Sequence, residues 1–319
     1  LEGEPETYVI PAAIASAGKE DKLSAEHTNA IIAKLKQRGK SEGSILFDAM
    51  VDGDFCELLL KSMSRRRVFK GKSGEILTSR TRAFRRLRGT GDIDLTPAIM
   101  KVEQTNTSVM YGSQLILKLF RRLEEGINPD IEIGQFLTEN TPFTNISKVA
   151  GYLEYRRSRK KPLSLAILQS YVPNEGDAWG YTLDILGSYL DKVLTHTTVQ
   201  APPIPRKPLL ALLKEPPALA QETIGSYLVS AQLLGQRTAE LHIALASRLQ
   251  NQDFAPEPFT MMYQTSLYQS LRGFAMRTMQ LLRERLRYLP EDQREGARHI
   301  LELEKNIIER YNTVRRQKI

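Results

Sequence analysis

The spacing of apolar residues changes once along the chain, near position 172. Before this point, short alternating runs predict strands, whereas after it the apolar residues recur at the spacing of long helices. The chain is therefore expected to fold as a β-rich part followed by an all-α part. The expected helices are Trp179 to Val193, Ala218 to Ser247, Tyr263 to Leu289 and Glu291 to the C-terminus, and the proline-rich stretch Thr198 to Pro208 should be a stiff connection between them.

Residues 91–172 predict a small, mainly β lobe with one helix. Asn128 can cap that helix, Pro129 suits its first position, and Asp130 complements the positive end of its dipole. Its apolar face is expected to consist of Ile133, Phe136 and Leu137. Gly112 and Ser113 predict a tight turn. The expected strands are Ile99 to Glu103, Ser108 to Tyr111, Leu115 to Phe120, Gly151 to Arg156 and Ser164 to Gln169.

Residues 1–90 read as a separate mixed α and β domain, which leaves 173–319 as the helical part. A hairpin turn is expected at Gly71 to Gly74, between two short apolar runs. The other expected elements are strands at Tyr8 to Pro11 and Ser44 to Phe47, and helices at Lys22 to Gln37 and Phe55 to Met63.

Composition excludes some classes of protein. With 41% hydrophobic residues, the 319-residue chain can bury substantial cores. No apolar run approaches the roughly 20 residues that span a bilayer, so no membrane interaction is expected. Cys56 is the only cysteine, which excludes an intrachain disulfide and fits a reducing cytoplasm. The chain begins without an initiator methionine or a signal-peptide pattern, and we expect it to be an excerpt of a longer protein.

Lys118 lies at a position where burying its charge should cost free energy. In the strand expected at Leu115 to Phe120, alternation places Lys118 on the same face as Ile116 and Phe120. A partly buried ammonium needs a counter-charge or an anionic ligand. In kinase-like proteins a strand lysine contacts nucleotide phosphates and a glutamate of the following helix holds it. Lys118 and Glu132 have this order and spacing.

Each feature also has a simpler interpretation. Lys118 could lie on an edge strand with its ammonium in water, beside an exposed Glu132. The polar stretch from Glu103 to Ser108 could present amides and hydroxyls to phosphate, or could be an ordinary hairpin turn. Gly71-Lys72-Ser73 is not a P-loop, because Arg66 stands where that motif needs glycine.

The net charge of 45 − 37 = +8 permits binding to phosphates, nucleic acid or an acidic partner. The basic runs lack regularly interleaved aromatic residues, so nucleic-acid binding is not expected. The four histidines show no metal-ligand spacing, and Gly-x-Ser-x-Gly is absent, so nothing supports a zinc site or a hydrolase.

Several blocks together resemble the bacterial maltokinase family, in particular the kinase-like domain found fused behind trehalose synthase. Their order and spacing extend over essentially the whole chain. The blocks are Val102 to Ser108, Leu115 to Leu123, Gly126 to Glu132, Ala166 to Asp177, Thr238 to His242 and Phe259 to Leu271. The resemblance implies an α+β fold like that of protein kinases and aminoglycoside phosphotransferases, with an N-terminal cap (1–90), a β-rich nucleotide-binding lobe (91–172) and a helical lobe (173–319).

The resemblance also implies the reaction and the roles of residues. ATP would transfer its γ-phosphoryl group to the anomeric hydroxyl of maltose, giving maltose 1-phosphate on a route to glycogen-like glucans, with Mg²⁺ neutralising charge. Lys118 would contact the ATP phosphates and Glu132 would orient it. The phosphate-facing turn would comprise Gln104, Thr105, Asn106, Thr107 and Ser108, and the interlobe hinge that bonds adenine would include Gln169, Tyr171 and Val172.

One departure from the family pattern is serious. The His-Gly-Asp catalytic loop and the following metal-binding aspartate are absent, because none of the four histidines precedes Gly-Asp. We expect these elements, including the Mg²⁺ ligands, beyond Ile319. The full-length protein would then be a kinase and this chain alone inactive, which maltose phosphorylation by residues 1–319 would contradict. The alternative is a non-catalytic kinase-like module whose basic surface docks a partner enzyme such as trehalose synthase.

Overall fold

The computed structural model describes residues 5–15, 23, 25, 27–35, 44–90, 93–100, 106–195 and 218–316. The chain forms two compact units, Leu1–Phe254 and Ala255–Ile319. It combines a β-sheet lobe with helical parts. Among the described residues the last strand ends at Ser170, and every later element is a helix. The change of character that the sequence predicted near position 172 is therefore confirmed.

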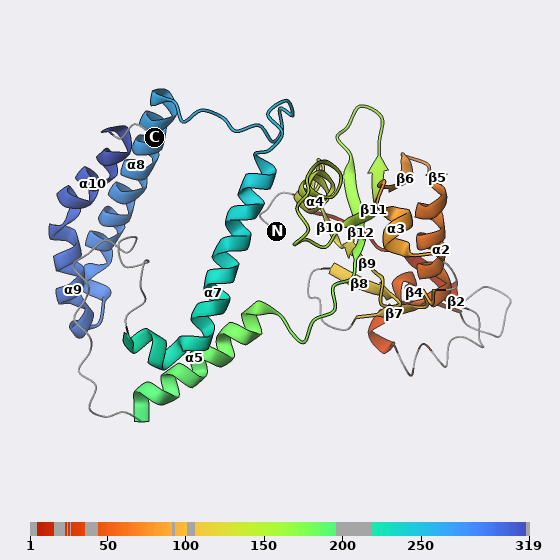
Figure 1. Ribbon diagram of the computed structural model, residues 1–319, viewed down its shortest axis with the longest axis horizontal. Helices are drawn as coiled ribbons and strands as arrows, with labels where there is room; N and C mark the ends of the chain where they lie inside the picture. The colour runs from red at the N-terminus through yellow and green to blue at the C-terminus, as the bar shows by residue number, and fades with distance from the viewer. Residues whose placement is uncertain are drawn as a thin grey trace. The chain divides into compact units, whose positions relative to one another are not determined.

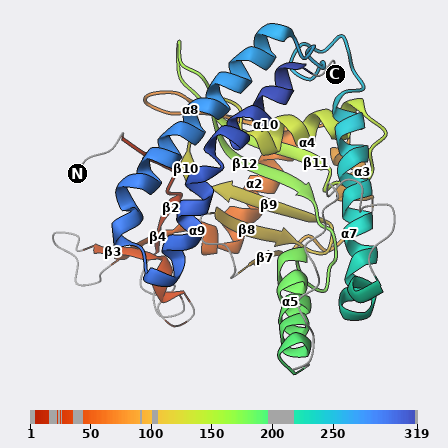
Figure 2. The same cartoon turned by 90° about the vertical axis from the view of Figure 1, so that its left-hand side faces the viewer.

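The first unit is built on a seven-stranded antiparallel sheet with the order β5-β6-β11-β12-β9-β8-β7. In Figure 2, β12, β9, β8 and β7 follow one another across it. Because β6 pairs with β11, the sheet runs across residue 90, where the sequence analysis placed a domain boundary. The strands are β5 (Val68–Lys70), β6 (Glu75–Arg80), β7 (Pro97–Ile99), β8 (Asn106–Tyr111), β9 (Leu115–Phe120), β11 (Val149–Arg156) and β12 (Leu163–Ser170).

Most of the expected strands lie where the alternation placed them, and the hairpin turn is closed by the Gly71 amide, which donates to the Gly74 carbonyl at 2.8 Å. The strand expected at Ile99 to Glu103 is described only at its first two residues, Ile99 and Met100. β7 ends at Ile99, and residues 101–105 lie outside the described part. The turn at Gly112 is confirmed: its φ is +54°, and a Cβ there would lie 2.0 Å from the Asp94 carbonyl oxygen.

The described residues also form two smaller sheets. One has the order β2-β4-β3, and the other pairs β1 with β10. The helix expected over Lys22 to Gln37 is wrong in its second half, because Ile31–Leu35 is strand β3. Its residues alternate between half-buried and exposed as they pair with β4, and β-branched isoleucines suit that pleated surface. The strands are β1 (Thr7–Tyr8), β2 (Ala12–Ala15), β3 (Ile31–Leu35), β4 (Ser44–Asp48) and β10 (Arg122–Leu123).

Helices α2 (Gly53–Arg65), α3 (Phe84–Arg88) and α4 (Pro129–Asn140) pack on the large sheet. The Asn128 side chain caps α4 by accepting from the Asp130 amide at 2.9 Å, as the sequence predicted. The apolar face of α4 differs in one residue. Ile131 is buried, whereas Ile133 is 38% exposed. Residues two positions apart on a helix differ by about 200° around its axis, so the two side chains point to nearly opposite sides.

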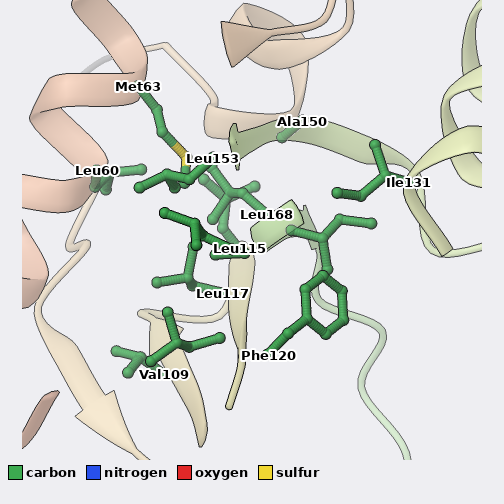
Figure 3. Packing of buried hydrophobic residues seen from close by; sticks show 14 of the residues in the cluster. Leu60, Met63, Val109, Leu115, Leu117, Phe120, Ile131, Ala150, Leu153 and Leu168 are labelled. Atoms are coloured by element: carbon green, nitrogen blue, oxygen red, sulfur yellow. The ribbon is translucent and has the colours of Figure 1, made fainter. Parts of the chain in front are cut away.

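The two faces of the sheet are covered by different helices. Leu115 and Leu117 are buried on one face. Tyr111, the partner of Leu115 in β8, donates its hydroxyl to the Cys56 carbonyl of α2 at 2.7 Å, so this face lies toward α2. Figure 3 shows Leu60 and Met63 of α2 on one side of the strand residues, and Ile131 of α4 near Phe120 on the other. Lys118 alternates with Leu117 and therefore faces α4.

The Cys56 thiol is buried beneath this sheet and donates to the Met50 carbonyl at 3.2 Å. Burial, followed by the nearby charges of Asp52 and Asp48, raises the pKa of Cys56 to about 12. Because the thiolate is the reactive form, we expect a disulfide reagent at pH 8 to label Cys56 slowly in the folded protein and rapidly in denaturant. Equal labelling rates in both states would contradict this placement. The folded-state pKa is raised, so the contribution of Cys56 to stability is complete below pH 9 and declines as the pH rises toward 12.

The helical parts are α5 (Ala178–Thr195) and α7 (Ala218–Leu245) in the first unit, and α8 (Met261–Arg285), α9 (Glu291–Glu302) and α10 (Glu304–Arg316) in the second. Among the described residues, short 3-10 helices occur at Thr28–Ala30, Ala49–Val51 and Leu286–Tyr288. The continuous helix expected from Glu291 onward is interrupted at Leu303. The stretch Thr198 to Pro208 lies outside the described residues. A search of the described helices finds none of the length and apolarity that crossing a membrane requires.

Candidate functional site

Lys118 lies on an interior strand. Its strand, β9, is bonded to β8 on one side and to β12 on the other, and its partners in register are Ser108 and Ile167. The lysine side chain is 32% exposed. The simpler interpretation that places Lys118 on an edge strand is therefore wrong. Its ammonium reaches solvent only by extending beyond the sheet face, toward the beginning of α4.

The carboxylate that pairs with Lys118 belongs to Asp130. The distance from Lys118 Nζ to Asp130 Oδ2 is 3.7 Å, while Glu132 is an exposed residue of the same first turn. Residues two positions apart on a helix point in nearly opposite directions, so one turn cannot present both to the same strand. The structure thus gives Asp130 the place that the sequence analysis gave to Glu132.

The described part of the polar stretch before Lys118 forms a strand and not a turn. Asn106, Thr107 and Ser108 begin β8, while Gln104 and Thr105 lie outside the described residues. The register between β8 and β9 places these three residues on different faces of the sheet. Ser108 pairs with Lys118, and Asn106 pairs with Phe120, so both share the lysine's face. Thr107 lies on the other face, where its hydroxyl accepts from Arg121 Nε at 2.9 Å.

Asn106 and Lys118 border a hollow of about 620 Å³, which is within the usual size of a ligand pocket. One wall comes from β8, β9 and β12, and the other from the segment that enters α4. The segment is held by the Asn128 amide, which donates to Ser164 Oγ at 2.9 Å. The lining residues are Asn106, Lys118, Phe120, Arg122, Glu124, Glu125, Gly126, Ile127, Asn128, Pro129, Asp130 and Ser164.

Two charged residues of the lining, Arg122 and Glu125, are paired with residues outside it. Arg122 lies 3.2 Å from Glu6, and Arg157 lies 3.1 Å from Glu125. The pair formed by Lys118 and Asp130 is longer, and the Asp130 side chain is 57% exposed. Charge-assisted hydrogen bonds measure about 2.7–2.9 Å, so Asp130 does not hold the ammonium closely. A cation that is anchored but loosely paired can bind an anionic oxygen.

The predicted hinge consists of the last two residues of β12, Gln169 and Ser170, and the two residues that follow, Tyr171 and Val172. Gln169 pairs with Ile116, which places it on the same face as Lys118. The Tyr171 amide donates to the Gln114 carbonyl at 2.8 Å, and the Val172 carbonyl accepts from Asn174 Nδ2 at 3.0 Å. Adenine binding at this hinge stays a prediction, and these two backbone groups already have partners within the chain.

Sequence reasoning missed most residues of the hollow as site residues, among them Asp130, Phe120 and Ser164. Asp130 was interpreted only through the helix dipole, and choosing it over Glu132 requires the rotation of α4 about its axis. Phe120 could have been found, because it alternates onto the same face as Lys118. No local signal marked Ser164, since it belongs to strand β12, which lies far from Lys118 along the chain.

Within the described residues, no group of three or more His, Cys, Asp or Glu side chains is placed to hold a metal ion. No protein-family model matches the chain. Among solved structures, it is similar to glucosamine kinase in crystal form B, with a TM-score of 0.46 and 17% identity over 93% of this chain and 62% of the other.

A second similar structure is glucosamine kinase in complex with glucosamine, ADP and inorganic phosphate. The TM-score is 0.47 and the identity 17%, covering 96% of this chain and 60% of that one. For crystal form A of glucosamine kinase the values are 0.47 and 18%, with coverage of 89% and 57%. The chain thus spans less than two thirds of the length of the solved structures that it matches.

Proposed function

We propose that this chain is the nucleotide-binding part of an ATP-dependent sugar kinase of the maltokinase type. The observation that carries the proposal is the placement of Lys118, which lies on an interior strand and 3.7 Å from a carboxylate of the helix that follows that strand. Protein kinases hold ATP phosphates with a lysine on such a strand, paired with an acidic residue on the next helix.

The surroundings of Lys118 support phosphate binding. The ammonium borders a hollow of about 620 Å³, and its pair with Asp130 is both long and open to solvent. A phosphate oxygen could approach within hydrogen-bond distance and form a shorter contact than Asp130 does. The Asn106 side chain borders the same hollow and adds an amide group. The proposed role of this chain is to bind and orient the phosphates of ATP.

The substrate and partners rest on the resemblance described above. Maltose would accept the γ-phosphoryl group, giving maltose 1-phosphate, and trehalose synthase would be a fused or separate partner. Mg²⁺ would neutralise charge on the phosphates, and we name no ligand for it among the described residues. The sequence contains no His-Gly-Asp, the tripeptide that the resemblance gives to the catalytic loop. The first test is therefore directed at nucleotide binding and not at turnover.

The proposal predicts that the chain binds ATP more tightly than adenosine. The two ligands share the base and ribose, so the difference between their dissociation constants reports the phosphate contacts. We expect at least about a tenfold difference, equivalent to about 1.4 kcal/mol, by isothermal titration calorimetry with Mg²⁺ present. Inorganic triphosphate should compete with ATP. Equal affinities for ATP and adenosine, or no binding of either, would contradict the proposal.

A further inference from the structure

Positive charge is concentrated in one short segment of the chain. Residues 61–88 contain 11 Lys or Arg and a single acidic residue, Glu75, which gives a net charge of +10. The remaining 291 residues contain 34 basic and 36 acidic residues, a net charge of −2. The overall excess of +8 therefore comes from this segment alone. A charge that is concentrated in one segment can create a strongly positive surface, which the net charge of the whole chain does not reveal.

The fold gathers the segment at one edge of the large sheet. It forms the end of α2, the β5-β6 hairpin and α3, which lie close together in Figure 1. Arg66 Nη2 donates to the Arg80 carbonyl at 3.4 Å, and Arg80 Nη1 donates to the Ser64 carbonyl at 2.6 Å. Arg65 and Arg88, from α2 and α3, line one hollow of about 730 Å³, whose lining also includes Asp54, Glu57 and Asp94. The charges are therefore neighbours in space as well as in sequence.

We call the exposed basic residues of this segment the basic edge. In the part of the chain that the structure describes, the ion pair of the basic edge joins Lys61 to Glu57 at 2.8 Å. Gathering so many like charges opposes folding, and an acidic ligand would offset that repulsion. The basic edge comprises Lys61, Arg65, Arg66, Arg67, Lys70, Lys72, Arg82, Arg85, Arg86 and Arg88.

Apolar side chains lie within the basic edge. β5 is the outermost strand of the sheet, and its residues Val68 and Phe69 are 51% and 40% exposed. Val68 and Phe69 lie between Arg67 and Lys70 in the sequence, and arginine beside apolar residues is typical of protein interfaces. Surfaces that bind single-stranded nucleic acid present successive aromatic side chains for base stacking, and Phe69 is the exposed aromatic residue of this described segment.

We propose that the basic edge is a docking surface for a protein partner that presents carboxylates interspersed with apolar side chains. Arginine suits this role, because its planar guanidinium can bind a carboxylate through two hydrogen bonds. β11 and β12 separate β6 from the strand that carries Lys118. Docking at this edge is therefore independent of nucleotide binding, and neither result decides the other.

The probe for this surface is a Glu-rich peptide with interspersed leucines, compared with a peptide of the same charge in which serine replaces leucine. Binding is measured by fluorescence anisotropy at low salt and near physiological salt. We expect the leucine peptide to bind at least about threefold more tightly, because its leucines can bury apolar surface against Val68 and Phe69. Both affinities should fall as salt screens the charges.

The decisive variant is R65Q/R67Q/R85Q/R86Q, which neutralises four exposed arginines of the basic edge. A matched control, R272Q/R277Q/R298Q/R310Q, removes four exposed arginines from the second unit. The first variant should weaken peptide binding at least about tenfold, or 1.4 kcal/mol, and the control should leave it nearly unchanged. Circular dichroism checks that both variants fold, and single substitutions at Arg85 and Arg86 provide the comparison if the fourfold variant does not.

Three outcomes would overturn the proposal. Equal weakening by the two variants would show that only net charge matters. Equal affinity for the leucine and serine peptides would remove the apolar contribution of Val68 and Phe69. Tighter binding, near physiological salt, of a single-stranded oligonucleotide with the same charge as the peptides would favour a nucleic-acid surface instead.

Discussion

Replacing Leu117 by alanine is expected to lower the free energy of unfolding of the first unit by about 2–5 kcal/mol. Leu117 is fully buried in the middle of β9, between Val109 of β8 and Leu168 of β12. Removing its side chain leaves a cavity where three strands of the sheet meet beneath α2. Urea denaturation followed by circular dichroism, together with amide hydrogen exchange in β8 and β12, measures the change.

The matched control for this substitution is Leu58→Ala. Leu58 belongs to α2, and its side chain is 44% exposed, so the same chemical change removes little buried surface. We expect this variant to stay within about 0.5 kcal/mol of the wild type, as is usual for surface substitutions. Similar losses of stability in the two variants would contradict the position of Leu117 in the core.

Replacing Lys118 by alanine is expected to weaken ATP binding by about tenfold to a hundredfold and to leave adenosine binding nearly unchanged. The estimate corresponds to the loss of a hydrogen bond to a charged group, about 1.5–3 kcal/mol. Lys118 lies beside the hollow and is held only loosely by Asp130, so a phosphate contact would be its strongest interaction. Calorimetric titration of both ligands into the wild type and the variant measures the difference.

Lys34→Ala serves as the control for Lys118→Ala. Lys34 is an exposed lysine on a strand of a different sheet, so its removal changes the net charge equally without changing the hollow. ATP affinity should be nearly unaffected in this variant. If Lys118→Ala weakens ATP and adenosine to the same extent, the lysine acts on the shape of the site and not on the phosphates.

Local patterns were sufficient to predict several elements of the fold. Alternation defined β9 from Leu115 to Phe120, and Asn128 followed by Pro129 marked the start of α4. The prediction was wrong at Ile31 to Leu35, where helical spacing competed with alternation. A segment of five residues fits both the helical and the alternating pattern, and here pairing with β4 stabilises the strand. Short segments depend on their partners more than on their own preferences.

The candidate site was predictable in its position along the chain but not in its composition. Lys118 and the polar residues before it were identified as candidates, and the register places Asn106 and Ser108 on the lysine's face. Thr107 lies on the opposite face of the sheet, because side chains alternate along a strand. Glu132 points away from Lys118, because it is two positions from Asp130 on the helix. Spacing along a sequence cannot supply either fact unless the register and the rotation of the helix are known.

By itself, the sequence determined the change from strands to helices near position 172, the unusual placement of Lys118 among apolar residues and the concentration of positive charge in residues 61–88. These properties follow from residue types and short-range spacing. Tertiary structure alone decided that β9 is an interior strand, that Asp130 pairs with Lys118, and that the basic residues gather at one edge of the sheet. The reason is physical: contacts between distant segments depend on strand order, register and helix rotation, which are set when the whole core packs.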